Sequence, residues 1–423
     1  MNPIGSAIRG AAVVVWPIVL LTILAIVLGG WGSTLAVIGC VTVGVLTAAI
    51  VAYLQVLKRS DTVYRRSIAD GLTRAFEGSR VIEENVDVRQ LRLIVLSDQH
   101  KGTRDGADDF WRSERAYAAA LAHYYEQGQR LVVLGDAEEL WECWSKSSLM
   151  RRYREVLELE AQFQAEGRYE RVWGNHDADW RRARSVDRHL APIFGSGLAV
   201  HEAIKLHLTD DGKRLGTLFL VHGHQGTADS EIFAHVSRPF VLLFGLAQRK
   251  FKKPWNTPAA NWDLRERHDR AMFHWARNRS QEGVVLIAGH THRPVFWDRR
   301  PHVPTSEHIR NLAQRLEQLR REGATVSQLS ETRAELEYRR AEQRWTTKPP
   351  AVIEPPCYFN TGCCAFADGD ATGIEIAAGK IRLVRFPDDD YRPRPQVLGE
   401  SAELTDVLER VRSFGGIGSS VEP

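Results

Sequence analysis

The sequence predicts an α/β domain that follows a pair of membrane-spanning helices, and three observations support this class. No charged residue lies between Arg9 and Lys58, so the first part of the chain is apolar enough to cross a bilayer. Beyond it, five short runs rich in Val, Leu and Ile are typical of buried strands. Amphipathic helical segments lie between several of these runs, and this alternation indicates an α/β fold.

Residues 1–60 are expected to form a transmembrane hairpin with a basic flank. Two apolar stretches within residues 10–57 meet at "WGS" (31–33), and each is long enough to cross a hydrocarbon core of about 30 Å as a helix. A cleaved signal peptide is the alternative, and the second apolar stretch argues against it. Because the flank "KRSDTVYRRS" (58–67) is basic and the turn is uncharged, the rest of the chain is expected in the cytoplasm, at an inner or plasma membrane.

The strands and helices of the remaining chain follow in order. The strands are expected at "LRLIVLS" (91–97), "RLVVLG" (130–135), "YERVWG" (169–174), "TLFLVHG" (217–223) and "GVVLIAG" (283–289), with helices at 109–128 and 147–167. These elements define a core domain over residues 91–300, behind a linker at 61–90 and with an aromatic and basic insertion at 235–280. A helical insertion at 301–350, C-terminal strands at 351–390 and a tail at 391–423 complete the predicted organisation.

The segment at 305–345 has apolar residues at spacings of three and four, while the rest of its surface is mostly Arg, Glu and Gln. This pattern predicts a helical hairpin, divided at Gly323. Such a hairpin can serve as a lid, an arm or a surface for a protein partner. A solvated helical decoration without a role explains the pattern equally well.

The composition disfavours two classes of protein. From Lys58 onward the chain carries 55 basic and 53 acidic residues, after Arg9 is subtracted from the total of 56. A nearly neutral domain lacks the strong basic field of a dedicated nucleic-acid binder, so no nucleic-acid partner is expected. The five cysteines include no C-x-x-C pair, which argues against a disulfide framework and against a thiolate zinc site.

Each of the five expected strands is followed by Asp, Asn or His. The residues are Asp98 and His100, then Asp136, then Asn175, His176 and Asp177, then His222 and His224, and finally His290 and His292. Any one of these groups by itself reads as ordinary turn sequence. The carboxyl ends of strands in α/β sheets are where such proteins build their sites. Carboxylate, amide and imidazole ligands suit divalent ions such as Mn, Fe, Zn or Ni, so the joint pattern predicts a metal site.

This set of motifs resembles the calcineurin-like metallophosphoesterase superfamily, whose motif order is D-x-H, G-D, G-N-H-[DE], H and G-H-x-H. The resemblance covers about residues 91–297 and extends to "CYFNTGCC" (357–364). It implies two packed mixed sheets flanked by helices, and two divalent metal ions. By position, Asp98, His100 and His292 would hold one ion, Asn175, His222 and His290 would hold the other, and Asp136 would bridge both.

The resemblance also implies a mechanism, in which a hydroxide that bridges the two metals attacks the phosphorus of a phosphoester or pyrophosphate. His176 would act as the general acid or stabilise the transition state, Glu139 would orient it, and Asp177 would support the loop. Arg293, beside the expected ligands, is a candidate for contact with substrate phosphate. Glu138 and His224 have no assigned role.

Two motifs are similar to those of UDP-diacylglucosamine pyrophosphohydrolase-like members of the superfamily. "GDAEELWE" (135–142) matches G-D-x-x-E-x-W, and "GHTHRP" (289–294) is also shared. These members typically have Arg where this chain has His176. The shared motifs therefore do not imply that this chain acts on the same substrate. A lipid-linked pyrophosphate, another phosphodiester, a nucleotide and a phosphoprotein stay open as substrates. The rival to an enzyme is a non-catalytic membrane scaffold, and retention of all seven expected ligands favours the enzyme.

Overall fold

The computed structural model describes residues 61–104, 108–141, 143, 145–227, 262–296, 306–323, 355–366, 369–388 and 394–416, with isolated positions between 329 and 336. The transmembrane hairpin expected at residues 1–60 lies outside the described residues. Within the part of the chain that is described, no helix is both long enough and apolar enough to span a bilayer.

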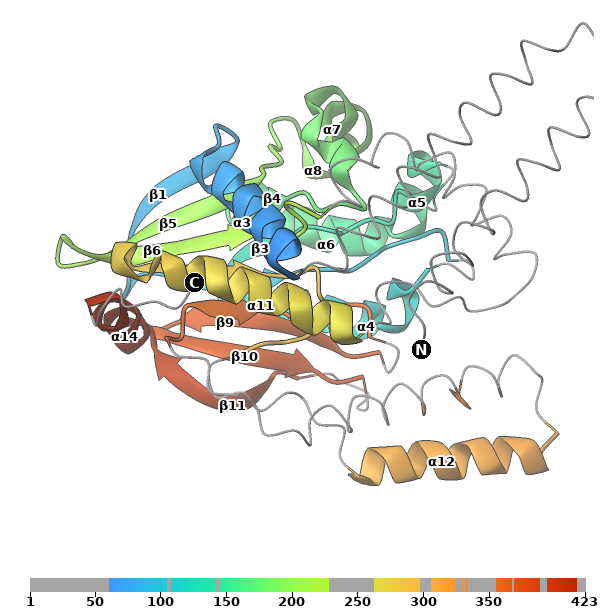
Figure 1. The fold of residues 1–423 in the computed structure, drawn as a ribbon. Helices are drawn as coiled ribbons and strands as arrows, with labels where there is room; N and C mark the ends of the chain where they lie inside the picture. Colours follow the sequence, from blue (N-terminus) through green and yellow to red (C-terminus); the bar gives the residue numbers. More distant parts are fainter. Residues whose placement is uncertain are drawn as a thin grey trace, which may run out of the picture. The chain divides into compact units, whose positions relative to one another are not determined.

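One mixed sheet contains five strands, in the order β1-β5-β6-β7-β8. Figure 1 shows β1, β5 and β6 of this sheet side by side. They are β1 (Val81–Asp87), β5 (Ala203–Asp210), β6 (Lys213–Val221), β7 (Val284–Ala288) and β8 (Tyr358–Asn360). Only the β5–β6 pair is antiparallel. Because β6, β7 and β8 run parallel, their carboxyl ends lie along the same edge of the sheet.

The second mixed sheet contains six strands, in the order β11-β10-β9-β2-β3-β4. They are β2 (Leu93–Leu96), β3 (Arg130–Leu134), β4 (Tyr169–Val172), β9 (Ala371–Ala377), β10 (Lys380–Phe386) and β11 (Gln396–Glu403). The β2–β3 and β3–β4 pairs are parallel and the others are antiparallel. The carboxyl ends of β2, β3 and β4 therefore also share one edge.

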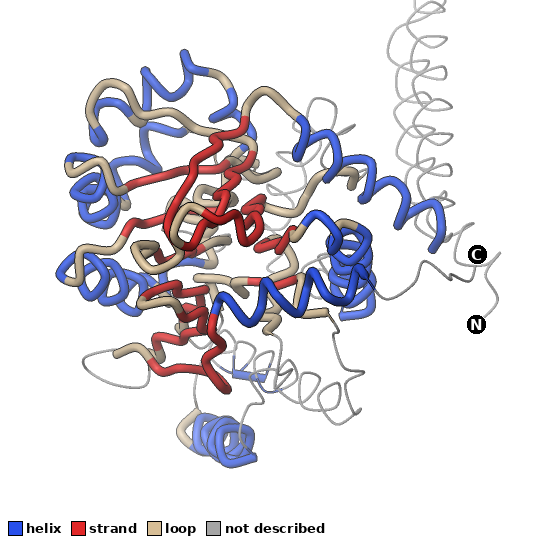
Figure 2. The backbone as a smooth tube through the Cα atoms, turned by 90° about the vertical axis from the view of Figure 1, so that its left-hand side faces the viewer, coloured by secondary structure: helices blue, strands red, loops and turns tan. Residues whose placement is uncertain are grey.

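Helices lie on the outer faces of the strands (Figure 2). On the six-stranded sheet, α4 (Glu114–Glu126) contacts β3 and β10, and α6 (Arg154–Ala165) contacts β3 and β4. On the five-stranded sheet, α11 (Trp262–Asn278) contacts β7 and β8, and α14 (Leu404–Gly416) contacts β6 and β7. The remaining described helices are α3 (Asp61–Glu77), α5 (Lys146–Arg152), α7 (Ala183–His189), α8 (Ala191–Phe194) and α12 (Ser306–Arg321). The expected fold of two mixed sheets flanked by helices is confirmed.

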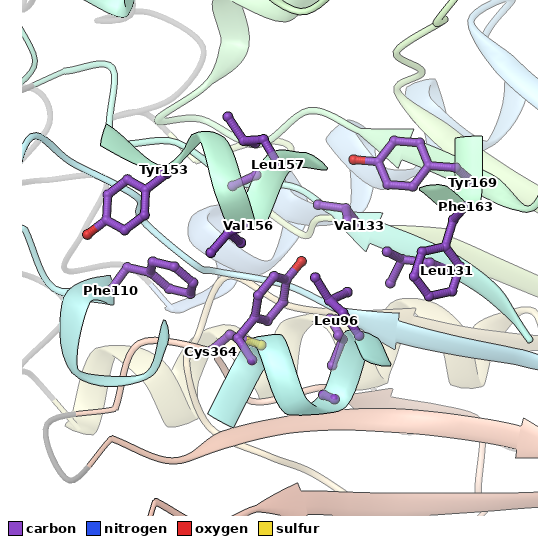
Figure 3. Close-up of a cluster of buried hydrophobic side chains, with 14 of the residues drawn as sticks. Leu96, Phe110, Leu131, Val133, Tyr153, Val156, Leu157, Phe163, Tyr169 and Cys364 are labelled. Carbon is purple, nitrogen blue, oxygen red and sulfur yellow. The ribbon is translucent and has the colours of Figure 1, made fainter. Parts of the chain in front are cut away.

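A large apolar core fills the space between the six-stranded sheet and its helices (Figure 3). In α4, Tyr117, Leu121 and Tyr124 recur at spacings of three and four, which places them on one face of the helix, and all three are buried. Leu131 and Val133 of β3 meet this face with no exposed surface. Burying such side chains stabilises the fold by about 1.5–3 kcal/mol each. The packed core therefore holds β3 in place, and with it the residues that follow the strand.

Two segments contain more structure than the sequence indicates. The expected linker at 61–90 contains α3 and β1, and the expected tail at 391–423 contains β11 and α14. Val407, Leu408 and Val411 of α14 are buried at helical spacing, so this helix belongs to the core domain. The helix expected near residue 305 is present as α12, where Ile309 and Leu316 form a small apolar cluster with Leu336.

Candidate metal centre

Polar residues from both sheets meet at one place, where the carboxyl ends of the strands adjoin. Backbone hydrogen bonds join the first two loops, from Asp98 N to Gly135 O (3.1 Å) and from His100 N to Asp136 O (2.9 Å). The loops after β2 and β7 are joined by His290 N, which donates to Asp98 Oδ2 (2.9 Å). The strand ends that the sequence places about two hundred residues apart therefore form one site.

Asp98, His100 and His292 form the first group of candidate ligands. One ligand atom from each lies within 4.8 Å of the other two. His292 Nε2 is 3.2 Å from Asp98 Oδ1, and His100 Nε2 is 3.1 Å from His292 Nε2. Two imidazole nitrogens and a carboxylate oxygen that converge in this way can hold one divalent ion.

Asp136, His222 and His290 form the second group, within the same 4.8 Å limit. Oδ2 of Asp136 lies 3.1 Å from His222 Nε2 and 3.8 Å from His100 Nε2, so this oxygen stands between the two groups. The other oxygen, Oδ1, accepts a hydrogen bond from the backbone N–H of His176 (2.8 Å). Asn175 precedes His176 in that loop and is buried.

The unused polar atoms of this site fit metal ions. Asp98 Oδ1, Asn175 Oδ1 and His222 Nε2 are buried and make no hydrogen bond within the described residues. Nδ1 of His222 is 2.9 Å from the carbonyl oxygen of Leu134, which can only accept, so Nδ1 carries a proton. In the neutral ring Nε2 then carries a free lone pair, which metal ligation requires. Buried ligand atoms of this kind are costly unless a cation satisfies them.

The electrostatic field of the site also favours cations. Burial lowers the pKa of His222, but Asp136 and Asp98 outweigh burial and raise it to about 9. Burial raises the pKa of Asp136, and His222 and His176 outweigh that effect and hold it well below its usual value. Burial also raises the pKa of Asp98, and His292 and His222 outweigh burial and lower it, so both buried carboxylates favour the ionised form. Divalent ions would replace the protons that these carboxylates draw onto the histidines.

The backbone of the candidate ligands is strained. Five of them have a positive φ, which residues other than glycine rarely adopt: Asp98 (55°), His100 (50°), Asp136 (50°), His290 (68°) and His292 (53°). Each such residue costs on the order of 1–3 kcal/mol, and strain of this kind clusters at functional sites. The loops therefore hold these side chains in a conformation that costs free energy, and this is typical of a functional site.

Glycines in the motifs allow the loops to approach one another. A Cβ atom on Gly135 would lie 2.6 Å from the ring of His222, and one on Gly289 would lie 2.5 Å from Asp98 Oδ2. Real Cβ atoms do not come this close to other atoms, so no other residue fits either position without a shift. The Gly of the G-D motif and the Gly of the G-H motif each make room for a ligand from another loop.

Glu139 connects a candidate ligand to the candidate acid. Its Oε2 lies 2.6 Å from Nδ1 of His176 and 3.2 Å from Nδ1 of His100. Burial lowers the pKa of His176, but Glu139 and Asp136 outweigh burial and raise it. The ring of Trp141 stacks on His176, with centroids 4.3 Å apart and planes 24° apart. His176 keeps 26% of its side chain exposed, so part of the ring is open to solvent.

The residues behind the loops form a buried network of charges. Glu138 accepts hydrogen bonds from Arg171 and from Trp180 Nε1 (2.8 Å). Lys101 Nζ lies 2.8 Å from Glu160 Oε1. Asp177 accepts from the backbone N–H groups of Gly174 (2.6 Å) and Ala137 (3.0 Å). Glu138 thus points away from the site and Asp177 holds two loops together.

Two residues that the sequence singled out have other contacts. Arg293 Nε lies 2.8 Å from Asp269 Oδ2, and 28% of its side chain is exposed. His224 is buried behind His222, with ring centroids 5.4 Å apart. Burial and the neighbouring His222 lower the pKa of His224 to about 3, so its ring is neutral. Neither residue belongs to the groups of candidate ligands.

Sequence reasoning missed His268 and Asp269 of α11, although both are buried at the site. They lie within the segment 235–280, for which the sequence predicts no strand and shows no strand-end motif. The rings of His268 and His290 have centroids 5.0 Å apart. Asn360, at the end of β8, donates to Gly289 O (2.7 Å), and the sequence pointed to it only through the resemblance at "CYFNTGCC" (357–364).

No protein-family model matches this chain, and no curated protein matches it. Among solved structures, a conserved uncharacterized protein from Streptococcus pneumoniae TIGR4, described as a predicted phosphoesterase, aligns with 73% of this chain and 98% of its own. The two are 12% identical and the TM-score is 0.25. A similarity at this level supports no assignment, so a function has to be argued from the site.

Proposed function

We propose that this protein is a dimetal phosphoesterase, which hydrolyses a phosphoester or pyrophosphate bond. The observation that carries the proposal is the place of Asp136, whose Oδ2 stands between the two groups of buried histidines and carboxylates. A carboxylate shared between two metal positions is typical of sites that stabilise both the attacking and the leaving oxygen of a displacement.

The donor set indicates which residues would hold the ions. Asp98, His100 and His292 would bind one, Asn175, His222 and His290 would bind the other, and Asp136 would contact both. When bound, the two cations would lower the pKa of water and neutralise the charge of the phosphate. Carboxylate, amide and imidazole ligands suit Mn, Fe, Zn or Ni.

His176 would deliver a proton to the oxygen of the leaving group. Its Nδ1 forms an ion pair with Glu139, which leaves Nε2 as the ring nitrogen that would meet a substrate. The stacked ring of Trp141 and the carboxylate of Glu139 fix the imidazole from two directions. A general acid held in this way accelerates a reaction by about 10²–10⁴-fold.

We also propose that the enzyme is attached to a membrane through residues 10–57 and acts on a lipid-linked substrate. The support is the uncharged apolar sequence between Arg9 and Lys58, followed by a basic flank that would attract anionic lipid. Sedimentation of the full chain with membranes after an alkaline wash tests the attachment. A substrate panel that includes a lipid-linked pyrophosphate and a soluble analogue tests the substrate class.

The full chain, loaded with Mn²⁺, is expected to hydrolyse bis(p-nitrophenyl) phosphate, and Asp136→Asn is expected to lower kcat by at least about 10–100-fold, since the ligand shared by both metal positions loses its negative charge. Asp187→Asn, the same change at an exposed position of α7, is the control and should retain full activity. Absence of turnover with any divalent metal on the whole substrate panel would reject the enzyme and favour a scaffold.

A further inference from the structure

Two consecutive residues of α11 reach two different loops of the candidate metal centre. His268 Nε2 lies 2.7 Å from the carbonyl oxygen of Gly223, which follows the candidate ligand His222. Because a carbonyl oxygen only accepts, Nε2 of His268 is the donor. Asp269, the next residue, accepts a hydrogen bond through Oδ1 from the hydroxyl of Thr291 (2.9 Å). Both side chains are buried, with 3% and 4% of their surfaces exposed.

Asp269 is the centre of a set of polar contacts at the G-H-T-H-R loop. Besides Thr291, Oδ1 accepts from the hydroxyl of Tyr358 on β8 (2.7 Å). Oδ2 forms an ion pair with Arg293 Nε (2.8 Å). The carboxylate thus holds the residue between the two candidate histidine ligands and the residue that follows them. Hydrogen bonds to a charged group are stronger than neutral ones, so these contacts restrain the loop firmly.

The loop needs such a restraint. Thr291 lies between His290 and His292, which belong to different groups of candidate ligands and both have a positive φ. A shift of Thr291 would therefore displace a ligand of each metal position at once. Asn360 adds a second anchor, because its Nδ2 donates to Gly289 O at the start of the loop (2.7 Å).

We propose that Asp269 is a positioning residue that sets the spacing of the two metal positions, by fixing the loop of His290 and His292 to α11, the helix that also contacts the loop of His222 through His268. This inference rests on the proposed dimetal function and assigns to α11 a role in it. Groups that orient metal ligands typically change metal affinity by about 10–100-fold when they are removed.

The test is Mn²⁺ binding to the full chain, measured by isothermal titration calorimetry together with the electron paramagnetic resonance signal of coupled Mn²⁺ pairs. Thr291→Val keeps the shape of the side chain and removes its hydroxyl, whereas Thr291→Ser keeps the hydroxyl. We expect Thr291→Val and Asp269→Asn to weaken Mn²⁺ binding by about 10–100-fold and to lose the coupled signal, while Thr291→Ser retains both. Glu266→Gln, at a partly exposed carboxylate of α11 that pairs with Arg270, is the control and should bind as the wild type does.

Each outcome decides between the alternatives. If Thr291→Val and Asp269→Asn bind two ions with wild-type affinity and coupling, the positioning role is wrong, whatever the activity. If Thr291→Ser loses binding as fully as Thr291→Val, the hydroxyl contact to Asp269 is not what matters, and the inference also fails. If the wild type binds a coupled Mn²⁺ pair without hydrolysing any phosphoester, the proposed function fails while the positioning role is still measured.

Discussion

At the scale of the residue, the adjacent side chains of Glu138 and Glu139 make contacts on opposite sides of their loop. Glu138 and Glu139 are both buried, yet Glu138 binds Arg171 and Trp180 behind the loop, while Glu139 faces His100 and His176 in the site. In extended backbone, successive side chains point to opposite sides, which explains the division. The sequence motif left Glu138 without a role, and its contacts now give it a structural one.

His176→Ala should distinguish a general acid from a merely structural histidine. With an alkyl ester, whose leaving group needs a proton, kcat is expected to fall by about 10²–10⁴-fold. With p-nitrophenyl esters, whose leaving group departs as an anion, the loss should be at least about tenfold smaller. Steady-state kinetics on the two substrates measure this ratio within one variant. Equal losses on both substrates would contradict the role.

At the scale of the element, β3 shows how a strand end becomes a site. Leu131 to Leu134 are apolar and buried, so the strand is fixed in the core, and polar groups begin only after Gly135. Gly128, before the strand, and Gly135, after it, both have a positive φ (68° and 85°). They differ in surroundings, because a Cβ atom on Gly128 would meet nothing within 4 Å, whereas one on Gly135 would meet His222.

Gly135→Ala should therefore destabilise the protein more than Gly128→Ala. The backbone strain of a positive φ costs about 1–2 kcal/mol in either variant. Overpacking against His222 should add about 1–3 kcal/mol at Gly135 alone. Urea unfolding of the metal-free proteins measures the difference. Equal losses of stability in the two variants would show that the close approach of β3 and His222 is not present in solution.

At the scale of the whole molecule, buried ion pairs tie a helix to the loops after two strands and to a third strand. Glu160 of α6 lies 2.8 Å from Lys101 in the loop after β2, and Lys101 lies 3.8 Å from Glu138 in the loop after β3. Glu138 in turn binds Arg171 of β4. A buried ion pair adds little stability by itself, but loss of one partner is costly. The network fixes the relative positions of the loops that carry the candidate ligands.

This network predicts a pH dependence of stability. Burial raises the pKa of Glu160, but Lys101 and Arg171 outweigh burial and hold it below its usual value. A lowered pKa means that the ionised form stabilises the fold above the unfolded pKa, and that this contribution is lost as the pH falls through the folded pKa. Glu160→Gln should cost about 3–5 kcal/mol near neutral pH and flatten the dependence of stability on pH below about pH 5.

Urea unfolding of the metal-free protein across this pH range checks the prediction. Glu158→Gln is a matched control on the same helix, since Glu158 is half exposed and pairs with Arg154 one turn earlier. Such surface pairs contribute only about 0.3–0.5 kcal/mol, so this variant should follow the wild type. Parallel pH profiles for Glu160→Gln and the wild type would mean that Glu160 is not ionised in the fold.

Much of the candidate site could be predicted from sequence because its residues directly follow apolar runs. Asp98, Asp136 and His290 each come within two residues of a buried strand, and a parallel strand presents its carboxyl end to the site. His268 and Asp269 could not be predicted, because their partners Gly223 and Thr291 are distant in sequence and α11 is, in itself, an ordinary amphipathic helix. β1, β5 and β11 were missed because charged or polar residues interrupt their sequences, which therefore lack a clear apolar run.

The sequence by itself determined which chemical groups follow each strand, since burial demands apolar runs and since carboxylates and imidazoles, the groups that divalent ions prefer, come directly after them. The tertiary structure alone decided that β2, β3 and β4 lie in one sheet and β6, β7 and β8 in the other. The physical reason is that the sequence of a buried apolar strand does not specify which other strands pair with it. Only the packed sheets bring Asp136 next to His222 and place α11 behind both histidine loops.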